Sequence, residues 1–129
     1  MIGEYVRRYP TPNEKEVALK TRILNYIQKK YCEPTFSVKT IEEKFSMSTA
    51  VLYRYFNKNF QTTPKKFIND LRIEKATYLL HKEDMTVKDA AISVGFKDSL
   101  YFSKVFKAKT GINPSEYYEY FMKKENKLI

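Results

Sequence analysis

Two stretches of this sequence place basic, small polar and methyl-bearing side chains on what would be one face of a helix. In the first, positions i, i+3, i+4 and i+7 are Ala50, Tyr53, Arg54 and Asn57. The same spacing recurs in the second as Leu100, Ser103, Lys104 and Lys107. A guanidinium can donate two hydrogen bonds to guanine, and an apolar side chain can contact the methyl group of thymine. The chemistry these faces favour is therefore recognition of a nucleic acid rather than catalysis.

The charge balance of the chain favours a polyanionic partner. Lys and Arg number 24 against 15 Asp and Glu, which gives a net charge of +9. Nucleic acid is the first candidate partner, and an anionic membrane surface is the second. The excess is spread along the chain, so no segment is a detachable basic tail.

The sequence offers no set of residues for metal binding or catalysis. Cys32 is the only cysteine and His81 the only histidine, which excludes zinc fingers and disulfide scaffolds within one chain. The acidic residues Glu42, Glu43 and Glu74 could be considered as catalytic or metal-binding carboxylates. No further acid, His or Cys recurs near them at the spacing of a ligand set. We therefore expect no catalytic residue, no metal and no cofactor.

Length and composition indicate one ordinary folded domain or two very small ones. A chain of 129 residues suits a single core, and three glycines leave little scope for tight hairpins or phosphate-cradling loops. No run reaches the roughly 18 apolar residues that a membrane span needs, and the first ten residues lack the apolar stretch of a signal peptide. We expect a cytoplasmic protein with no segment embedded in a membrane.

The pattern of caps and apolar residues predicts an all-α protein of about seven helices. An arm or linker at 1–13 precedes a domain at 14–129, whose first helix is expected at 14–31. Ser37, Ser48, Thr63 with Pro64, Thr86, Asp98 and Asn113 with Pro114 are expected helix starts. Short helices at about 38–45 and 48–59 precede a long helix at about 64–81. Helices at about 87–94, 98–110 and 114–124 follow it.

The two pairs of short helices can be laid over each other, at an offset of forty-nine residues in the leading helices and fifty in the second helices. Leu52, Arg54, Phe56, Pro64 and Phe67 match Phe102, Lys104, Phe106, Pro114 and Tyr117 in order. Only two residues connect the helices of the first pair, which is helix-turn-helix geometry. A unit that occurs twice, once on either side of a long helix, predicts a structure with two similar helical units rather than a single active-site cleft.

Residues from about 37 to 122 resemble the AraC/XylS family of bacterial transcription regulators. The stretch 72–80, RIEKATYLL, looks like the family's linker-helix motif. The stretch 94–117, VGFKDSLYFSKVFKAKTGINPSEY, is similar to its most recognisable signature. The resemblance implies a DNA-binding domain with one helix-turn-helix motif at about 37–60, a linker helix at about 64–81, a second motif at about 86–110 and a last helix at about 114–124. Its recognition helices, at about 48–59 and 98–109, would read adjacent segments of the major groove in double-stranded DNA.

The resemblance also implies roles for individual residues. Base-reading positions fall on Ala50, Tyr53, Arg54, Ser99, Leu100, Ser103 and Lys104. Phosphate contacts are expected from Ser37, Asn57, Lys58, Thr86, Lys107 and Lys109. Lys65 is interpreted instead as a solvated surface lysine. In two places the first motif departs from the family pattern, because Glu42 replaces a small residue and Ser46 replaces a turn glycine.

Three classes of function remain open at this point. The first is a sequence-specific DNA-binding regulator. The second is a basic helical domain that binds anionic membranes or a protein partner. The third is a small enzyme, although no residue in the sequence supports this class. For the regulator, the partners expected are double-stranded DNA and RNA polymerase, with no small-molecule ligand in this domain. A sensor or receiver domain would precede it if the sequence is a fragment of a longer protein.

Overall fold

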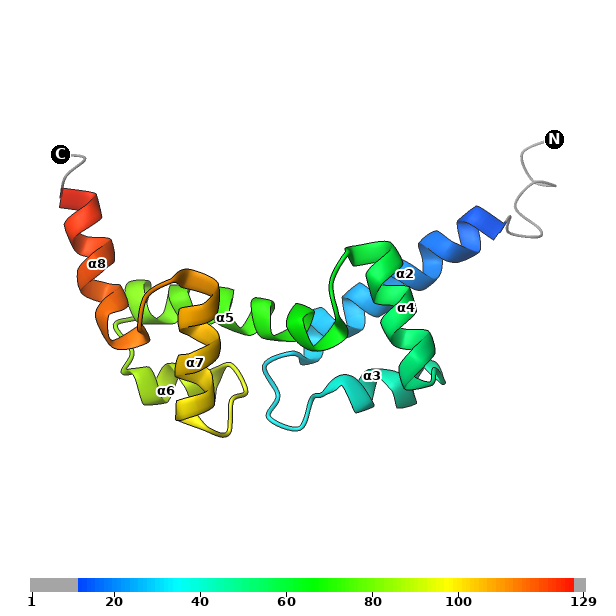
Figure 1. The fold of residues 1–129 in the computed structure, drawn as a ribbon, viewed down its shortest axis with the longest axis horizontal. Helices are drawn as coiled ribbons and strands as arrows, with labels where there is room; N and C mark the ends of the chain where they lie inside the picture. Colours follow the sequence, from blue (N-terminus) through cyan, green and yellow to red (C-terminus); the bar gives the residue numbers. More distant parts are fainter. Residues whose placement is uncertain (1–11, 127–129) are drawn as a thin grey trace. The chain divides into compact units, whose positions relative to one another are not determined.

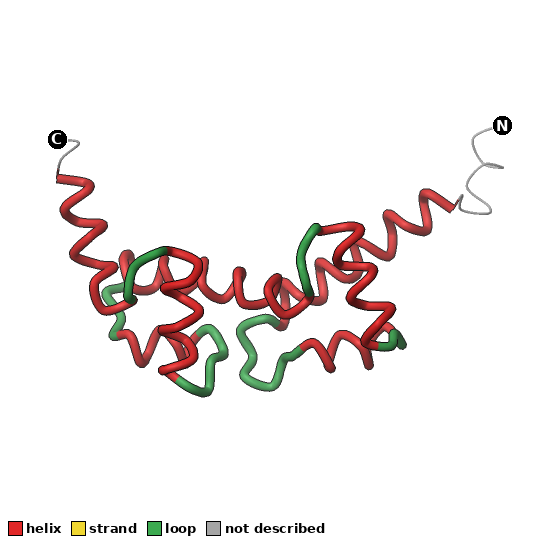
Figure 2. The backbone as a smooth tube through the Cα atoms, in the orientation of Figure 1, coloured by secondary structure: helices red, strands yellow, loops and turns green. Residues whose placement is uncertain are grey.

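The computed structural model describes residues 12–126, which form seven helices and no strand (Figures 1 and 2). The predicted all-α class and number of helices are confirmed. The chain divides into two compact units between Lys30 and Tyr31. No helix among the described residues is long and apolar enough to cross a membrane.

The first unit contributes helix α2, Pro12–Lys30. It begins two residues before the predicted start, with a proline in the first turn, where the missing N–H has no helical partner to lose. Ile23 and Ile27, four residues apart on the predicted apolar face, are fully buried. Most of the predicted arm at 1–13 lies outside the described residues.

The second unit begins with the first helix-turn-helix pair, α3 (Val38–Phe45) and α4 (Thr49–Phe60). Ser37 and Ser48 occupy the predicted N-cap positions, and the Ser48 hydroxyl accepts a hydrogen bond from the Val51 backbone N–H at 3.2 Å. A side-chain acceptor satisfies a donor that the first turn of a helix leaves unpaired. Both short helices therefore begin where the sequence places a serine.

The long helix α5 spans Pro64–Lys82. Thr63 caps it by accepting a hydrogen bond from the Lys66 N–H at 3.1 Å, and Pro64 occupies its first turn, as predicted. Ile68, Arg72 and Ala76 are all buried on one stripe of α5, at intervals of four residues. A charged residue in the middle of a buried stripe requires partners for its polar atoms.

Helices α6 (Val87–Ser93), α7 (Ser99–Thr110) and α8 (Pro114–Asn126) complete the second unit. Thr86 and Asp98 cap α6 and α7, and the Asp98 carboxylate accepts from the Leu100 N–H at 2.9 Å. Their apolar sides join α5 in one core that includes Ile73, Ala76, Leu80, Ala91, Val94, Phe102 and Phe106. In Figure 1, α3 and α4 lie toward the N-terminal end of α5, and α6, α7 and α8 lie toward its C-terminal end.

The sequence repeat is also a repeat in space. Phe56 meets Phe67 edge to face, with ring centroids 5.5 Å apart, and Phe106 meets Tyr117 in the same way at 5.4 Å. The equivalent turns are closed by equivalent hydrogen bonds, from Met47 N–H to the Glu42 carbonyl and from Phe96 N–H to the Ala91 carbonyl. The two pairs therefore pack their second helices by the same contacts.

The copies differ at two left-handed backbone positions. Ser46 and Gln61 have φ values of 52° and 54°, whereas the equivalent residues of the second copy are Gly95 and Gly111, at 101° and 81°. The left-handed backbone conformation costs a residue with a Cβ atom roughly 1–2 kcal/mol of stability. The first motif forms its turn with Ser46 in place of glycine and carries that cost.

Candidate nucleic-acid interface

Helix α4 presents the first predicted recognition face to solvent. Leu52 and Phe56 on its inner side are fully buried. The predicted contact residues on its outer side are all exposed: Ala50, Tyr53, Arg54, Asn57 and Lys58. The helix therefore separates an apolar side that holds the fold from a basic side that is open to a partner.

Helix α7 repeats this arrangement with different side chains. Phe102 and Phe106 are fully buried, while Ser99, Leu100, Lys104 and Lys107 are exposed and Ser103 is half-buried. Leu100 is 81% exposed, so its methyl groups are available for contact with a partner. Because this face has no Arg, Asn or Gln, its possible base contacts come from lysine ammonium groups, serine hydroxyls and the methyl groups of Leu100.

Ser37 and Thr86 lie at the exposed starts of α3 and α6, the two helices that precede the recognition helices. The Thr86 hydroxyl accepts a hydrogen bond from the Asp89 N–H at 3.1 Å, and the Ser37 N–H donates to the Thr40 hydroxyl at 3.1 Å. These positions are suited to a phosphate because helix N-termini favour negative charge.

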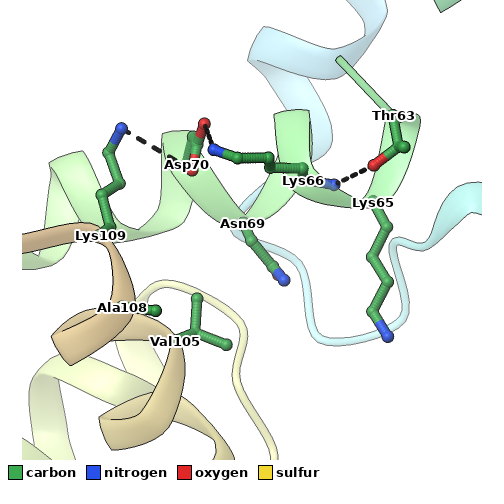
Figure 3. A pocket seen from close by; sticks show the side chains of 8 residues that line it. All are labelled: Thr63, Lys65, Lys66, Asn69, Asp70, Val105, Ala108 and Lys109. Carbon is green, nitrogen blue, oxygen red and sulfur yellow. Dashed lines mark hydrogen bonds and ion pairs between the residues drawn. The ribbon is translucent and has the colours of Figure 1, made fainter.

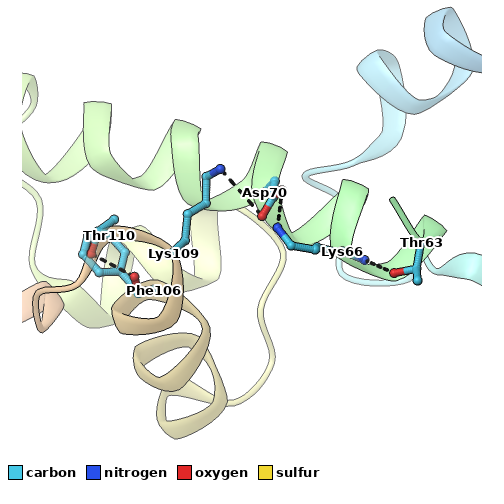
Figure 4. A network of polar contacts seen from close by, with 6 residues as sticks. All are labelled: Thr63, Lys66, Asp70, Phe106, Lys109 and Thr110. Carbon is cyan, nitrogen blue, oxygen red and sulfur yellow. Dashed lines mark hydrogen bonds and ion pairs between the residues drawn. The ribbon is translucent and has the colours of Figure 1, made fainter. Parts of the chain in front are cut away.

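Lys109 is placed differently from the other predicted phosphate contacts. Its ammonium group lies 3.7 Å from a carboxylate oxygen of Asp70 on α5, and Lys66 pairs with the other oxygen of Asp70 at 2.9 Å (Figure 4). Figure 3 shows the cleft of about 280 Å³ that these residues line between α5 and α7. Lys109 therefore links the end of α7 to α5.

A second link between α7 and α5 involves Tyr101. Its hydroxyl accepts a hydrogen bond from the Asn69 side-chain amide at 3.1 Å, and the Lys65 ammonium lies 5.6 Å from the centre of its ring. Lys65 is exposed, as predicted, and in addition makes this cation–π contact. Both links leave the outer face of α7 open.

Arg72 is buried at the centre of the second unit, with 8% of its surface exposed. Its Nε donates to the Tyr31 carbonyl at 2.6 Å, and its Nη2 donates to the carbonyls of Glu33 and Phe36 at 3.1 and 3.0 Å. The guanidinium carbon lies 5.6 Å from the centre of the Phe96 ring. Burial lowers the pKa of Arg72 below its ordinary value, and Cys32 and Tyr101 oppose this effect. An arginine nevertheless keeps its charge in proteins.

Sequence reasoning missed the contacts of Arg72, although one signal was present. Ile68, Arg72 and Ala76 recur every four residues, so Arg72 falls on the apolar stripe of the linker helix. A charged residue at such a position predicts a buried group with partners. Its partners could not be named, because they lie 36 to 41 residues away in the chain.

The remaining reactive side chains form no cluster. Within the described part of the chain, no three His, Cys, Asp or Glu side chains are grouped so that they could hold a metal ion. The His81 ring packs against Phe121, with centroids 3.8 Å apart. The Cys32 thiol is free.

Comparison with known proteins identifies relatives over most of this unit. A family model described as a helix-turn-helix domain matches residues 41–120. The Msm operon regulatory protein of Streptococcus mutans is 36% identical over 80 residues, which are 62% of this chain. The HTH-type transcriptional activator RhaS of Escherichia fergusonii is 31% identical over 104 residues, or 81% of this chain.

A solved structure resembles most of this chain. The C-terminal domain of the two-component response regulator yesN from Fusobacterium nucleatum is 32% identical, with a TM-score of 0.75, and the match covers 78% of this chain and 98% of that one. By contrast, the chain spans only 29% and 37% of the length of the two curated relatives.

Proposed function

Because this chain belongs to the AraC/XylS family of transcription regulators, we propose that it binds double-stranded DNA at a specific sequence, with α4 and α7 in adjacent segments of the major groove. The observation that carries the proposal is the duplicated helix with a buried aromatic side and an exposed basic side. A function in binding, not in catalysis, follows from the same premise.

The dimensions and direction of the two helices support this mode of binding. An α-helix with its side chains is about 10–12 Å across, and the major groove of B-DNA is about 12 Å wide. In Figure 1, α4 and α7 begin on the same side of the second unit and run toward α5. Two recognition helices on one face of a duplex meet successive major-groove segments about 34 Å apart.

The two helices have unequal roles in the proposed complex. Arg54 pairs with guanine through two hydrogen bonds, and Tyr53 contacts a thymine methyl group or a phosphate. Ala50 and Leu100 contact thymine methyl groups, while Lys104, Ser99 and Ser103 face bases in the second segment. Base selection therefore depends mainly on α4, and α7 contributes affinity and methyl contacts.

Phosphate contacts in the proposed complex come from Lys58 and Lys107, from Asn57, and from the helix starts at Ser37 and Thr86. Lys109 contributes less than Lys107, because its charge is already engaged by Asp70. We expect log Kd to depend steeply on log salt concentration, since each neutralised phosphate releases about 0.9 counterions.

The wider role of the protein is also a proposal. RNA polymerase is the expected protein partner of a regulator that acts at a promoter, and the place of action is the cytoplasm, where bacterial DNA lies. We propose no small-molecule site in this domain. If the sequence is part of a longer protein, the rest would carry a sensor or receiver domain.

Selection of bound duplexes from a random pool tests the proposal. The selected duplex should bind with a Kd at least about 10³-fold below that of unselected DNA at the same salt. Binding that is indifferent to sequence would refute sequence-specific recognition.

A matched pair of variants tests the residue roles. Arg54→Ala should reduce discrimination at one base pair by about 1–3 kcal/mol. Lys107→Ala should weaken binding to all duplexes equally and reduce the salt slope by about 0.9. An unchanged base preference in Arg54→Ala, or a base-specific loss in Lys107→Ala, would contradict these assignments.

A further inference from the structure

We propose that Arg72 is a positioning residue that fixes the separation of α4 and α7, so that the protein selects the spacing between its two DNA half-sites as well as their bases. The DNA part of this inference rests on the proposed function. Its structural part concerns the chain alone and can be tested without DNA.

The Arg72 guanidinium contacts both halves of the second unit. On one side it donates three hydrogen bonds to the carbonyls of Tyr31, Glu33 and Phe36. That segment leads directly into α3 and the first motif. On the other side the guanidinium lies over the ring of Phe96, in the turn before α7. One side chain of α5 thus joins the entry of the first motif to the turn of the second.

The same two segments also meet directly at Gly95. A Cβ atom on Gly95 would lie 2.9 Å from the Cys32 carbonyl oxygen and 3.2 Å from Cζ and Nε of Arg72. Cys32 in turn packs against the core of the second motif. At Gly95, the segment that carries the carbonyl acceptors is therefore in close contact with the second motif, with no room for an added Cβ.

The choice of arginine follows from this geometry. A planar guanidinium presents its donors in a fixed fork, so three bonds to one backbone segment fix both the distance and the direction of that segment. A lysine ammonium at the same place keeps the charge but lacks the fork and the flat surface for Phe96. Arg72→Lys is therefore the change that loosens the junction while retaining a buried cation.

The recognition helix of the second motif is attached to the same part of α5. Tyr101 is bonded to Asn69 near one end of α7, and Lys109 is paired with Asp70 at the other. Helix α7 therefore keeps its place on α5. The junction at Arg72, together with the contact of Phe56 on α4 with Phe67 on α5, holds the first motif on the same helix. One base pair added between two half-sites moves them apart by about 3.4 Å and rotates them by about 34–36°. A rigid junction cannot follow such a change.

Distance measurements between spin labels test the structural part. Cys32→Ser provides a cysteine-free background, and labels are attached at Glu43→Cys on α3 and Lys88→Cys on α6, both exposed positions outside the proposed DNA contacts. We expect one narrow distance distribution in this background and a broadened or shifted one after Arg72→Lys. Leu79→Ala, which removes a buried side chain from the core of the second motif, serves as the control and should leave the distribution narrow.

Binding to respaced duplexes tests the DNA part. In the selected duplex, one base pair is inserted or deleted between the half-sites, and Kd is measured for each protein. The unmodified chain and Leu79→Ala should lose at least about tenfold in affinity, and Arg72→Lys less than about threefold, with base preferences within each half-site unchanged.

Each result of these two experiments either supports or refutes the proposed role of Arg72. An unchanged narrow distribution in folded Arg72→Lys overturns the proposal, as does equal broadening in Leu79→Ala. If Arg72→Lys does not fold, Phe96→Leu, which removes the ring from the guanidinium but keeps an apolar side chain, should give the same broadening, and its absence refutes the role. A broadened distribution without any preferred duplex would uphold the junction and refute the proposed function instead.

Discussion

Among residues 12–126, two glycines have a positive φ, and they provide a test of how closely the halves of the second unit are packed. Gly95 and Gly111 both adopt backbone conformations that L-residues avoid. An added Cβ at Gly111 would meet nothing within 4 Å, whereas at Gly95 it would lie 2.9 Å from the Cys32 carbonyl oxygen. Replacing each glycine by alanine therefore imposes a similar backbone strain but a steric conflict at only one site.

The expected magnitudes follow from these two contributions. The left-handed backbone costs an alanine roughly 1–2 kcal/mol, and the lower entropy of the unfolded chain returns about 0.4–1 kcal/mol. Gly111→Ala should thus lower the free energy of unfolding by about 1 kcal/mol. Gly95→Ala adds an overpacking cost of about 1–3 kcal/mol, because Arg72 is held by three hydrogen bonds and cannot yield easily. Its total should be about 2–4 kcal/mol.

Urea unfolding followed by circular dichroism at 222 nm measures both variants. In a thermal scan the difference between them should be at least about 3–5 °C in Tm, since about 1 kcal/mol shifts the Tm of a chain this long by that amount. Equal losses in the two variants, or a smaller loss in Gly95→Ala, would show that the junction has room for a methyl group. A rigid junction at Gly95 and Arg72 would then be refuted.

Two further predictions concern backbone strain and pH. Ser46→Gly should raise the free energy of unfolding by about 0.5–1 kcal/mol, because glycine adopts a φ of 52° without the cost of a Cβ; a loss of stability in urea unfolding would contradict this account of the first turn. Burial, assisted by the charges of Cys32 and Glu74, raises the pKa of Tyr31 above its ordinary value. The folded state then retains that proton more strongly than the unfolded state, so this contribution to stability is constant below about pH 10 and is lost as pH rises further. Tyr31→Phe should show a smaller loss of stability between about pH 9.5 and 11 than the unmodified chain, and identical pH profiles would refute the assignment.

The helix boundaries were predictable because they depend on local signals. Ser48, Thr63 and Asp98 each accept a hydrogen bond from a backbone N–H of the first helical turn. Such caps act over two or three residues, so the sequence reveals them directly. The buried stripes of α4 and α7 were predictable for the same reason, since helical spacing alone brings Phe56 and Phe106 to the inner side.

The long-range contacts were not predictable from local spacing. Lys109 was expected to bind phosphate, yet its charge lies beside Asp70, and the position of that carboxylate depends on how α7 packs on α5. Arg72 belongs to the stretch that resembles the linker-helix motif, but its hydrogen-bond acceptors are backbone carbonyls. Every residue has a backbone carbonyl, so the residue types do not indicate which ones accept. The base and phosphate contacts stay predictions, because they depend on a second molecule and not on contacts within the chain.

On α7, the residues that attach the helix to α5 are different from the residues that face solvent. This difference affects how the sequence of the helix can vary. The side chains that fasten this helix, Tyr101 and Lys109, are distinct from its outward residues Leu100, Lys104 and Lys107. Under the proposed function, substitutions at Leu100 or Lys104 would thus alter base contacts and substitutions at Lys107 would alter affinity alone, while the scaffold and its geometry stay intact. The DNA contacts proposed for α7 can therefore change one residue at a time without loss of the fold.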